Sequence, residues 1–418
     1  MTRVSWLLVF ACWAVGAARA ESASGGFGSK PILVYNEDSD NVFRASYHAK
    51  TNRYEETEFR RYLEAVIGPG KITHFFMDVN ARVANFPSKT VCPYWACLDD
   101  PTMDHPAWIS AMKDFAVTQG KDHIRIWTAM CREKGVSPWI SVRMNDIHCV
   151  YDPKFFANVG FWKAHPEFWC NPQSVSHRAG PWHDRALDYS HREVRDWMLA
   201  FVREVLEVYD PDGLEIDWMR FEHHLPKGRE RELSWALDET MREIRRLTDA
   251  AAKRRGHRVL VAARVDSDPQ SAINHGTDYR VWAKERLVDW LIPCNFFNSV
   301  DFELPYARWV AEVGRLNPQV TIVPGLDCGV TFGGKRRLLT ADEYCGWGER
   351  MDRQGAPGAY FFNLFSFYSP SLANCMGGGS LEPWQVIVKD GFTTEVIRAH
   401  RRSIPEGAPR ECEPWLKH

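Results

Sequence analysis

The sequence predicts an α/β fold, a single-domain (β/α)8 TIM barrel. Three observations support this prediction: eight short apolar segments, amphipathic segments in most of the gaps between them, and polar residues at the same end of each apolar segment. Short buried strands that alternate with helices are typical of a parallel sheet, and eight such units close a barrel. We therefore expect residues 30–366 to form one barrel. The expected strands are residues 32–35, 72–79, 138–142, 213–217, 259–265, 288–293, 320–324 and 358–362.

The segments between the expected strands carry the apolar spacing of helices. Residues 192–209, for example, place Val194 and Met198 four positions apart, on one face of a helix. Thr340 with Glu343 three residues later has the pattern of a helix N-terminus, where each side chain caps the other's backbone N–H. The expected helices are residues 55–67, 122–134, 192–209, 233–255, 278–286, 305–316 and 340–353.

Two of the expected connections are longer than a barrel requires. Residues 81–106 follow the second strand, and residues 144–190 follow the third. Both connections leave the carboxyl ends of strands, which is the end where barrels of this kind place their sites. Long connections are more often functional than idle, so we expect both to contribute to a site.

The N-terminus has the pattern of a signal peptide. Arg3 precedes a short apolar run, and Ala18-Arg19-Ala20 then offers the small residues that a signal peptidase reads. We expect residues 1–20 to be removed and the mature protein to be secreted or periplasmic. Residues 21–29 are predicted to be a flexible lead-in, and residues 367–418 a C-terminal extension packed on the barrel. No later run reaches the ~20 apolar residues that a membrane span needs.

Composition excludes some partners and keeps others open. The formal net charge is −2, and without a basic stripe we expect no nucleic-acid partner. The eleven cysteines include one in the signal segment, and the even remainder permits disulfides, with Cys92 and Cys97 as a plausible pair. Eighteen tryptophans fit either a large core or flat platforms for sugar rings. The aromatic candidates for such platforms are Trp139, Trp218, Phe296, Phe297 and Tyr360.

Polar side chains cluster at the carboxyl ends of the expected strands. Side chains alternate along a strand, so Glu215 and Asp217 share one face of the fourth strand. Charged groups are costly to bury alone, so polar pairs on several strands imply mutual contacts around a common cavity. The residues expected to bind substrate there are Asp78, Asn80, Arg143, Asn145, Glu215, Arg220, Arg264, Asn295, Asn298 and Asn363.

This ring of polar groups favours carbohydrate chemistry. Carboxylates, amides and guanidinium groups make directional hydrogen bonds to hydroxyls, and hydrolysis of a glycosidic bond typically takes two carboxyl groups. The candidate catalytic residues are Asp217, Glu222, Asp266 and Asp327. The competing interpretation is that these acids only form ion pairs with Arg143, Arg220 and Arg264, which would make the ring a salt-bridge network at the barrel end.

Residues 212–221, Asp-Gly-Leu-Glu-Ile-Asp-Trp-Met-Arg-Phe, carry a family resemblance. The segment is similar to the chitinase signature D-G-x-D-x-D-x-E, but Met219 stands where chitinases have their proton donor, so chitinase chemistry is not expected. Together with His-Phe-Phe-Met-Asp-Val-Asn at 74–80, it resembles exported bacterial glycoside-hydrolase-like barrels related to family ten, over most of residues 30–366. This resemblance implies Asp217 as the nucleophile, and the partner acid stays open among Asp327, Glu222 and Asp266.

The leading hypothesis is a secreted glycoside hydrolase that needs no cofactor and acts on a polysaccharide or oligosaccharide. One alternative is a carbohydrate-binding barrel that has lost catalysis, which the departure at Met219 keeps open. A second is a metal-dependent hydrolase on the same fold. Histidines are scattered without a metal-binding spacing, so we expect no metal. The sugar, the linkage, the stereochemistry and the oligomeric state stay open at this point.

Overall fold

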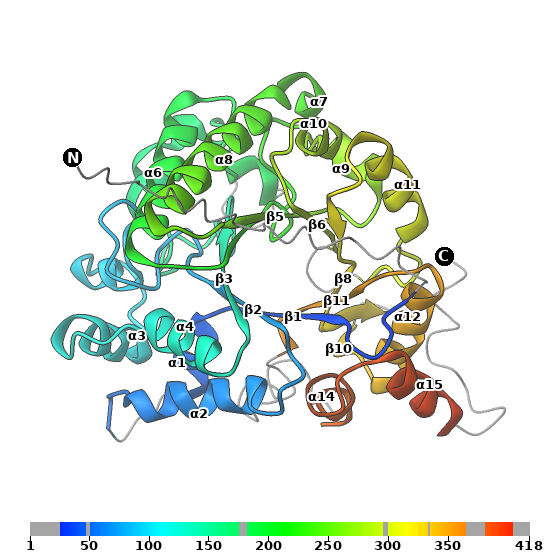
Figure 1. The fold of residues 1–418 in the computed structure, drawn as a ribbon. Helices are drawn as coiled ribbons and strands as arrows, with labels where there is room; N and C mark the ends of the chain where they lie inside the picture. The colour runs from blue at the N-terminus through cyan, green and yellow to red at the C-terminus, as the bar shows by residue number, and fades with distance from the viewer. Residues whose placement is uncertain are drawn as a thin grey trace, which may run out of the picture.

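A computed structural model describes residues 26–46, 51–174, 182–295, 300–332, 335–364 and 381–403. Its centre is a nine-stranded, all-parallel sheet in the order β7-β6-β5-β4-β3-β2-β1-β11-β8, which helices surround (Figure 1). This arrangement confirms the predicted fold class. The strands are β1 (Ile32–Glu37), β2 (His74–Asp78), β3 (Ser137–Arg143), β4 (Gly213–Asp217), β5 (Leu260–Val265), β6 (Trp290–Pro293), β7 (Thr321–Ile322), β8 (Gly325–Asp327) and β11 (Gly358–Phe362).

The two outermost strands of this sheet are parts of one chain segment, and that segment closes the barrel. The N–H of Val323 donates to the carbonyl of Leu291 in β6 at 3.0 Å, and the carbonyl of Pro324 accepts from Tyr360 in β11 at 2.9 Å. The predicted seventh strand, residues 320–324, is therefore corrected to two short strands with different partners. Pro324 lies at the change of partner because proline has no N–H with which to continue a ladder.

The principal helices lie close to their predicted positions. Thr340 and Glu343 form the predicted reciprocal cap at the start of α12, with the N–H of Glu343 donating to the Thr340 hydroxyl at 3.2 Å. The helices that follow the strands are α2 (Glu56–Ile67), α4 (His123–Glu133), α6 (Arg192–Val208), α8 (Trp235–Arg255), α10 (Tyr279–Lys284), α11 (Tyr306–Leu316) and α12 (Ala341–Arg353). None of the helices within the described ranges is long and apolar enough to cross a membrane.

Shorter elements fill the connections. The long segments after β2 and β3 hold short helices, and an antiparallel hairpin that the sequence did not predict follows β8. The remaining elements are α1 (Asp40–Ser46), η1 (Tyr94–Asp99), α3 (Ala107–Lys113), η2 (Asp114–Thr118), α5 (Gly160–Ala164), η3 (Pro166–Phe168), η4 (Trp182–Arg185), α7 (Glu230–Leu233), α9 (Pro269–Asn274), β9 (Gly329–Phe332), β10 (Lys335–Leu338), α14 (Glu382–Trp384), η6 (Gln385–Lys389) and α15 (Thr394–Ser403).

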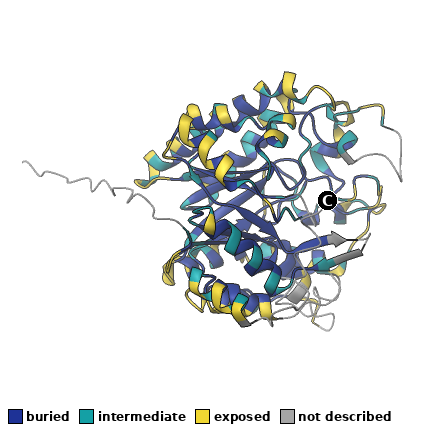
Figure 2. Cartoon of the chain, turned by 90° about the vertical axis from the view of Figure 1, so that its right-hand side faces the viewer, coloured by how far each residue is buried: buried dark blue, intermediate teal, exposed yellow. Residues whose placement is uncertain are grey.

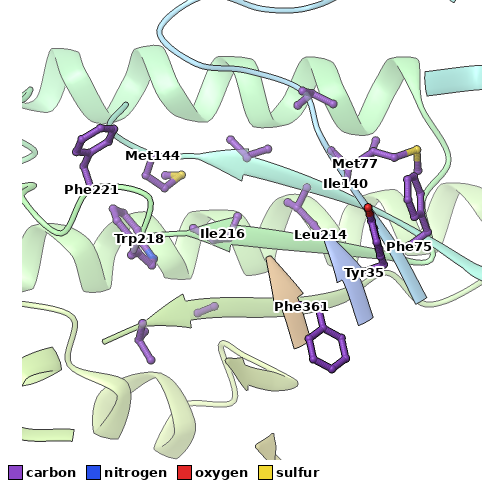
Figure 3. Close-up of a cluster of buried hydrophobic side chains, with 14 of the residues drawn as sticks. Tyr35, Phe75, Met77, Ile140, Met144, Leu214, Ile216, Trp218, Phe221 and Phe361 are labelled. Atoms are coloured by element: carbon purple, nitrogen blue, oxygen red, sulfur yellow. The ribbon is translucent and has the colours of Figure 1, made fainter. Parts of the chain in front are cut away.

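Strand alternation divides the apolar side chains into two layers. One layer lies between the strands and the helices, where Ile140, Leu214 and Ile216 belong to the cluster drawn in Figure 3. The other fills the inside of the barrel with Phe76, Trp139 and further residues of the same face. Burial is concentrated on the central sheet, and exposed residues lie on the outer helices (Figure 2).

Two sequence expectations concern segments outside the barrel proper. The described part of the C-terminal region contacts it through rings: Trp384 lies 6.2 Å from Tyr35, and Phe392 lies 5.1 Å from Phe361. The predicted signal peptide, residues 1–20, lies outside the described residues.

The suggested pairing of Cys92 with Cys97 is wrong, because both are free thiols and Cys97 donates to the carbonyl of Tyr94.

Candidate functional site

The polar strand ends form a row of alternating charge on the inner face of the barrel. In the strand register, Arg143 of β3 lies beside Asp217 of β4, and Asp217 lies beside Arg264 of β5. The shared inner face follows from the two-residue period of strands. Asp217 therefore has a cationic neighbour on each side, which reduces the cost of burying its charge.

Asp217 is held at the centre of this row by three donors. One of its oxygens, Oδ1, accepts the backbone N–H groups of Met219 and Arg220 at 2.9 and 2.8 Å, and Oδ2 accepts Arg264 Nη1 at 3.1 Å. Arg264 also donates to the carbonyl of Asn295 and lies over the ring of Phe362, 4.0 Å from its centroid. These contacts fix both the position and the orientation of the Asp217 carboxylate.

Arg143 gathers three acids on the other side of the row. Its guanidinium pairs with Asp38, with Asp78 at 3.4 Å and with Asp146 at 3.1 Å. Burial raises the pKa of Asp38, but the charges of Arg143 and Arg220 outweigh it and leave the pKa lowered. Burial dominates at Asp78, whose pKa lies well above its usual range although Arg143 opposes the shift. Two neighbouring acids thus differ in their readiness to ionise.

Asp38 also joins two of the residues predicted to bind substrate. Asn363 donates to its Oδ2 at 2.8 Å, and an Arg220 nitrogen lies 3.7 Å from the same oxygen. The same Arg220 nitrogen lies 3.1 Å from Nε2 of His148. The cluster of Asp38, Arg143, Arg220 and Asn363 is therefore one connected network that spans β1, β3, the end of β4 and β11.

Glu215 lies one layer below Asp217, inside the barrel. It accepts a hydrogen bond from Asn36 at 2.9 Å and is fully buried. Burial, followed by the charge of Asp217, raises its pKa to about 7. Glu215 is therefore a carboxyl group that titrates near neutral pH, although its depth sets it apart from the open acids described next.

Glu222 and Asp266 are the more open of the four candidate catalytic acids. The Glu222 side chain is 24% exposed, and burial together with the charge of Asp266 raises its pKa. Asp266 is 10% exposed and contacts Nδ1 of His275 with Oδ1 at 3.0 Å. Asp327, by contrast, is fully buried, and its Oδ1 accepts the N–H of Cys328 at 2.6 Å.

Three more of the predicted binding residues have amide groups that serve the backbone. Asn80 bonds to the N–H and carbonyl of Arg143, and Asn145 bonds to both backbone groups of Leu187 and to the carbonyl of His223. The Asn295 side chain accepts the N–H of Asp301. These contacts tie the long connections to the barrel, so the amides position the site. Asn298 lies outside the described residues.

The aromatic platforms expected from the sequence are wrong wherever the structure describes them. Trp139 and Tyr360 belong to the packed interior of the barrel, and Trp218 is buried in the layer beneath the helices. Their rings contact other side chains, as in the stacking of Trp139 on Phe76 at 4.7 Å. Phe296 and Phe297 lie outside the described residues.

Four charged or titratable residues of this region were not among the predicted site residues: Asp38, Asp146, His148 and His275. Three of them belong to the networks of Arg143 and Arg220, and strand-end position signalled Asp38 and Asp146. Nothing in the local sequence pattern signals the partner of His275. Among the described residues, no group of three or more His, Cys, Asp or Glu side chains has the arrangement to hold a metal ion.

No family model and no curated protein matches the chain. The family-ten resemblance therefore stays a prediction. Similar solved structures include a GH36 α-galactosidase, AgaA, from Geobacillus stearothermophilus, with 14% identity, a TM-score of 0.42, and coverage of 91% of this chain and 43% of that one. An α-L-fucosidase, isoenzyme 2, from Paenibacillus thiaminolyticus has 12% identity, a TM-score of 0.49, and coverage of 89% and 50%.

The glycoside hydrolase domain of PgaB (BpsB) from Bordetella bronchiseptica is similar over 84% of this chain and 99% of that one, with 12% identity and a TM-score of 0.47. This chain spans half or less of the α-galactosidase and fucosidase chains. At identities this low, an activity for this chain has to be argued from its own side chains.

Proposed function

We propose that this protein is a glycoside hydrolase in which Asp217 is the nucleophile or base and Glu222 is the proton donor. One observation carries the proposal: the two acids occupy opposite environments at the same end of the barrel. Asp217 faces a guanidinium and two N–H groups, whereas Glu222 lies beside another acid and its pKa is raised. Carboxyl groups whose environments differ in this way are suited to opposite roles.

The contacts of Asp217 suit a group that must stay oriented while charge moves. Its two backbone donors come from the turn that directly follows β4, so the carboxylate cannot rotate without losing them. Preorganised hydrogen bonds of this kind lower the reorganisation needed during reaction. Arg264 holds the second oxygen of the carboxylate, so both oxygens of Asp217 have fixed partners.

Glu222 suits the opposite role because it keeps its proton to a higher pH than an ordinary glutamate. Burial and Asp266 raise its pKa, and its partial exposure leaves the carboxyl within reach of a leaving-group oxygen. Asp327 is the least open of the remaining candidates. We therefore place the donor role on Glu222 and keep Asp327 as a structural acid.

The experiment uses two leaving groups. After a glycan panel has identified a cleaved substrate, wild type, Asp217→Asn and Glu222→Gln are assayed on that glycan and on the matching 2,4-dinitrophenyl glycoside. A dinitrophenolate leaves without protonation, so Glu222→Gln should lose about 10²–10⁴-fold on the glycan and far less on the aryl substrate. Asp217→Asn should lose activity on both, and Glu232→Gln, an exposed acid, serves as the control.

Equal losses on both substrates for Glu222→Gln would refute its role as proton donor, and full activity of Asp217→Asn would refute the assignment of Asp217.

A second candidate function is a carbohydrate-binding barrel without turnover. It is favoured by the ion pairs that engage Asp38, Asp146 and Asp217. Glycan binding by calorimetry with no product on the whole panel would support it.

Export is part of the proposal. Residues 1–20 are proposed to direct the chain out of the cytoplasm and to be cleaved after Ala20. Mass spectrometry of the protein recovered from periplasm or medium should find Glu21 at its N-terminus. Recovery of the full-length chain in the cytoplasm alone would contradict export.

A further inference from the structure

Asp266 and His275 come together through a short helix that follows β5. Asp268 caps this helix, α9, by accepting the N–H groups of Gln270 and Ser271 at 2.8 and 2.9 Å. The helix ends at Asn274, and His275, the next residue, contacts Asp266. Nδ1 of His275 lies 3.0 and 3.2 Å from the two oxygens of the Asp266 carboxylate.

A short chain of contacts connects this pair to Glu222. Nε2 of His223 lies 3.8 Å from Oε1 of Glu222, and the His223 ring lies 5.9 Å from the His275 ring, edge to face. Glu222, His223, Asp266 and His275 therefore form one polar wall, although the first two residues follow β4 and the last two follow β5. The charges of Asp266 and His275 act on Glu222 in opposite directions, the first favouring and the second opposing its protonated form.

The other groups that face this wall are few within the described residues. His183, from the long connection after β3, lies 5.0 Å from the His223 ring and 3.4 Å from Asp184. Lys227 acts on His223, and Glu230 acts on His275. Burial, followed by the charge of His183, lowers the pKa of His223 to about 4, so His223 is neutral at neutral pH. Asp266 and His275 thus remain as the two groups whose charges act on Glu222.

We infer that Asp266 and His275 act together as a positioning pair for Glu222: the Asp266 carboxylate holds the proton on Glu222, and His275 orients that carboxylate and limits its effect. Neither residue needs to touch the substrate. The inference rests on the proposed role of Glu222, and it assigns His275 a function that the sequence did not suggest. Burial opposes a charged His275, but the hydrogen bond and charge of Asp266 outweigh it and raise the pKa of His275.

The test is a pair of substitutions with opposite expected signs. Asp266→Asn removes the negative charge, so Glu222 should titrate at lower pH, and the alkaline limb of the kcat profile should move down by about one pH unit. His275→Asn removes the positive charge, so the limb should move up. The double variant should lie close to wild type, because both charges are gone. If the two substitutions only loosened the structure, they would not move the alkaline limb in opposite directions.

A second readout does not need activity. The carboxyl carbon of Glu222 can be followed by ¹³C NMR titration of the intact protein, with Glu222→Gln to assign the signal. Its titration midpoint should fall in Asp266→Asn and rise in His275→Asn. The control is His257→Asn, which removes the partner of Asp210 in an exposed pair before β4 and β5 and should leave the midpoint unchanged.

The outcomes separate the inference from the proposed function. Opposite NMR shifts with no shift in the kcat profile would support the coupling and overturn Glu222 as the proton donor. Shifts in one direction, or none, would overturn the inference even if the glycan assay confirmed hydrolysis. Circular dichroism shows whether Asp266→Asn folds. If it does not fold, His275→Asn alone decides, because a mere loss of packing would not raise the titration midpoint of Glu222.

Discussion

Arg264 donates to Asp217 at 3.1 Å, and both side chains are shielded from solvent almost completely. A buried pair of this kind is costly to form and more costly to break, because removing one partner leaves the other charge unpaired. The pair also connects neighbouring strands of the closed barrel. Its integrity therefore links the stability of the fold to the orientation of the proposed nucleophile.

Arg264→Met should lower the free energy of unfolding by about 3–5 kcal/mol, because the Asp217 charge is left buried without its partner. Urea unfolding measures this loss, and Asp217→Asn/Arg264→Met should recover much of it. The control is Arg242→Ala in the exposed pair with Glu285, where a change of about 0–1 kcal/mol is expected. A loss at Arg264 no greater than that of the control would contradict the role of the buried pair.

Glu215 should make stability depend on pH. Its pKa in the folded protein is about 7, above the ordinary glutamate value of 4.5. The folded state therefore binds the proton more tightly, and the stabilisation is present below pH 4.5 and lost as the pH rises through 7. Between pH 4.5 and 8, wild type should lose ~3 kcal/mol relative to Glu215→Gln.

Denaturant unfolding of wild type and Glu215→Gln across this pH range tests the sign. The difference between the two proteins removes the contribution of titrating groups that do not interact with Glu215. Parallel pH profiles for the two proteins would show that Glu215 carries no raised pKa.

Asn145→Ala should loosen the long connection after β3. The amide accepts the N–H of Leu187 and donates to two carbonyls, so the variant leaves buried backbone groups unpaired at a cost of about 1–3 kcal/mol. Hydrogen exchange should show faster exchange at Leu187, with no change at Ile216 in β4. Asn274→Ala, at an exposed helix end, is the matched control. Unchanged protection of Leu187 would refute the tether.

Gly213→Ala should destabilise the barrel interior. A Cβ at this position would lie 2.4 Å from ring atoms of Trp139, which packs against Phe76 and Trp290 and cannot withdraw freely. We expect a loss of about 1–3 kcal/mol. Gly314→Ala in α11 meets no atom within 4 Å and should raise stability by up to ~1 kcal/mol, since alanine favours helix. Thermal unfolding of the two variants should give melting temperatures that move in opposite directions.

The sequence by itself determined the barrel and the end of it that carries the polar residues. Strand alternation, helix periodicity and the Thr340 cap are local patterns, so they survive without knowledge of distant neighbours. The positions of Asp217 and Glu222 at the end of the fourth strand could be read in the same way. The local pattern also placed Arg143 and Arg264 on the same face as Asp217.

Only the tertiary structure decided which of these groups meet. The pairing of β4 with β5 brought Arg264 to Asp217, and the pairing of β1 with β11 brought Asp38 to Asn363. The short helix α9 placed His275 against Asp266. The structure buries Trp139 inside the barrel, and it replaces the predicted seventh strand by two short strands on either side of Pro324. The physical reason is that a contact between distant side chains depends on the stagger of the strands and the path of the loops. Packing across the whole barrel sets both, so the local sequence pattern does not show them.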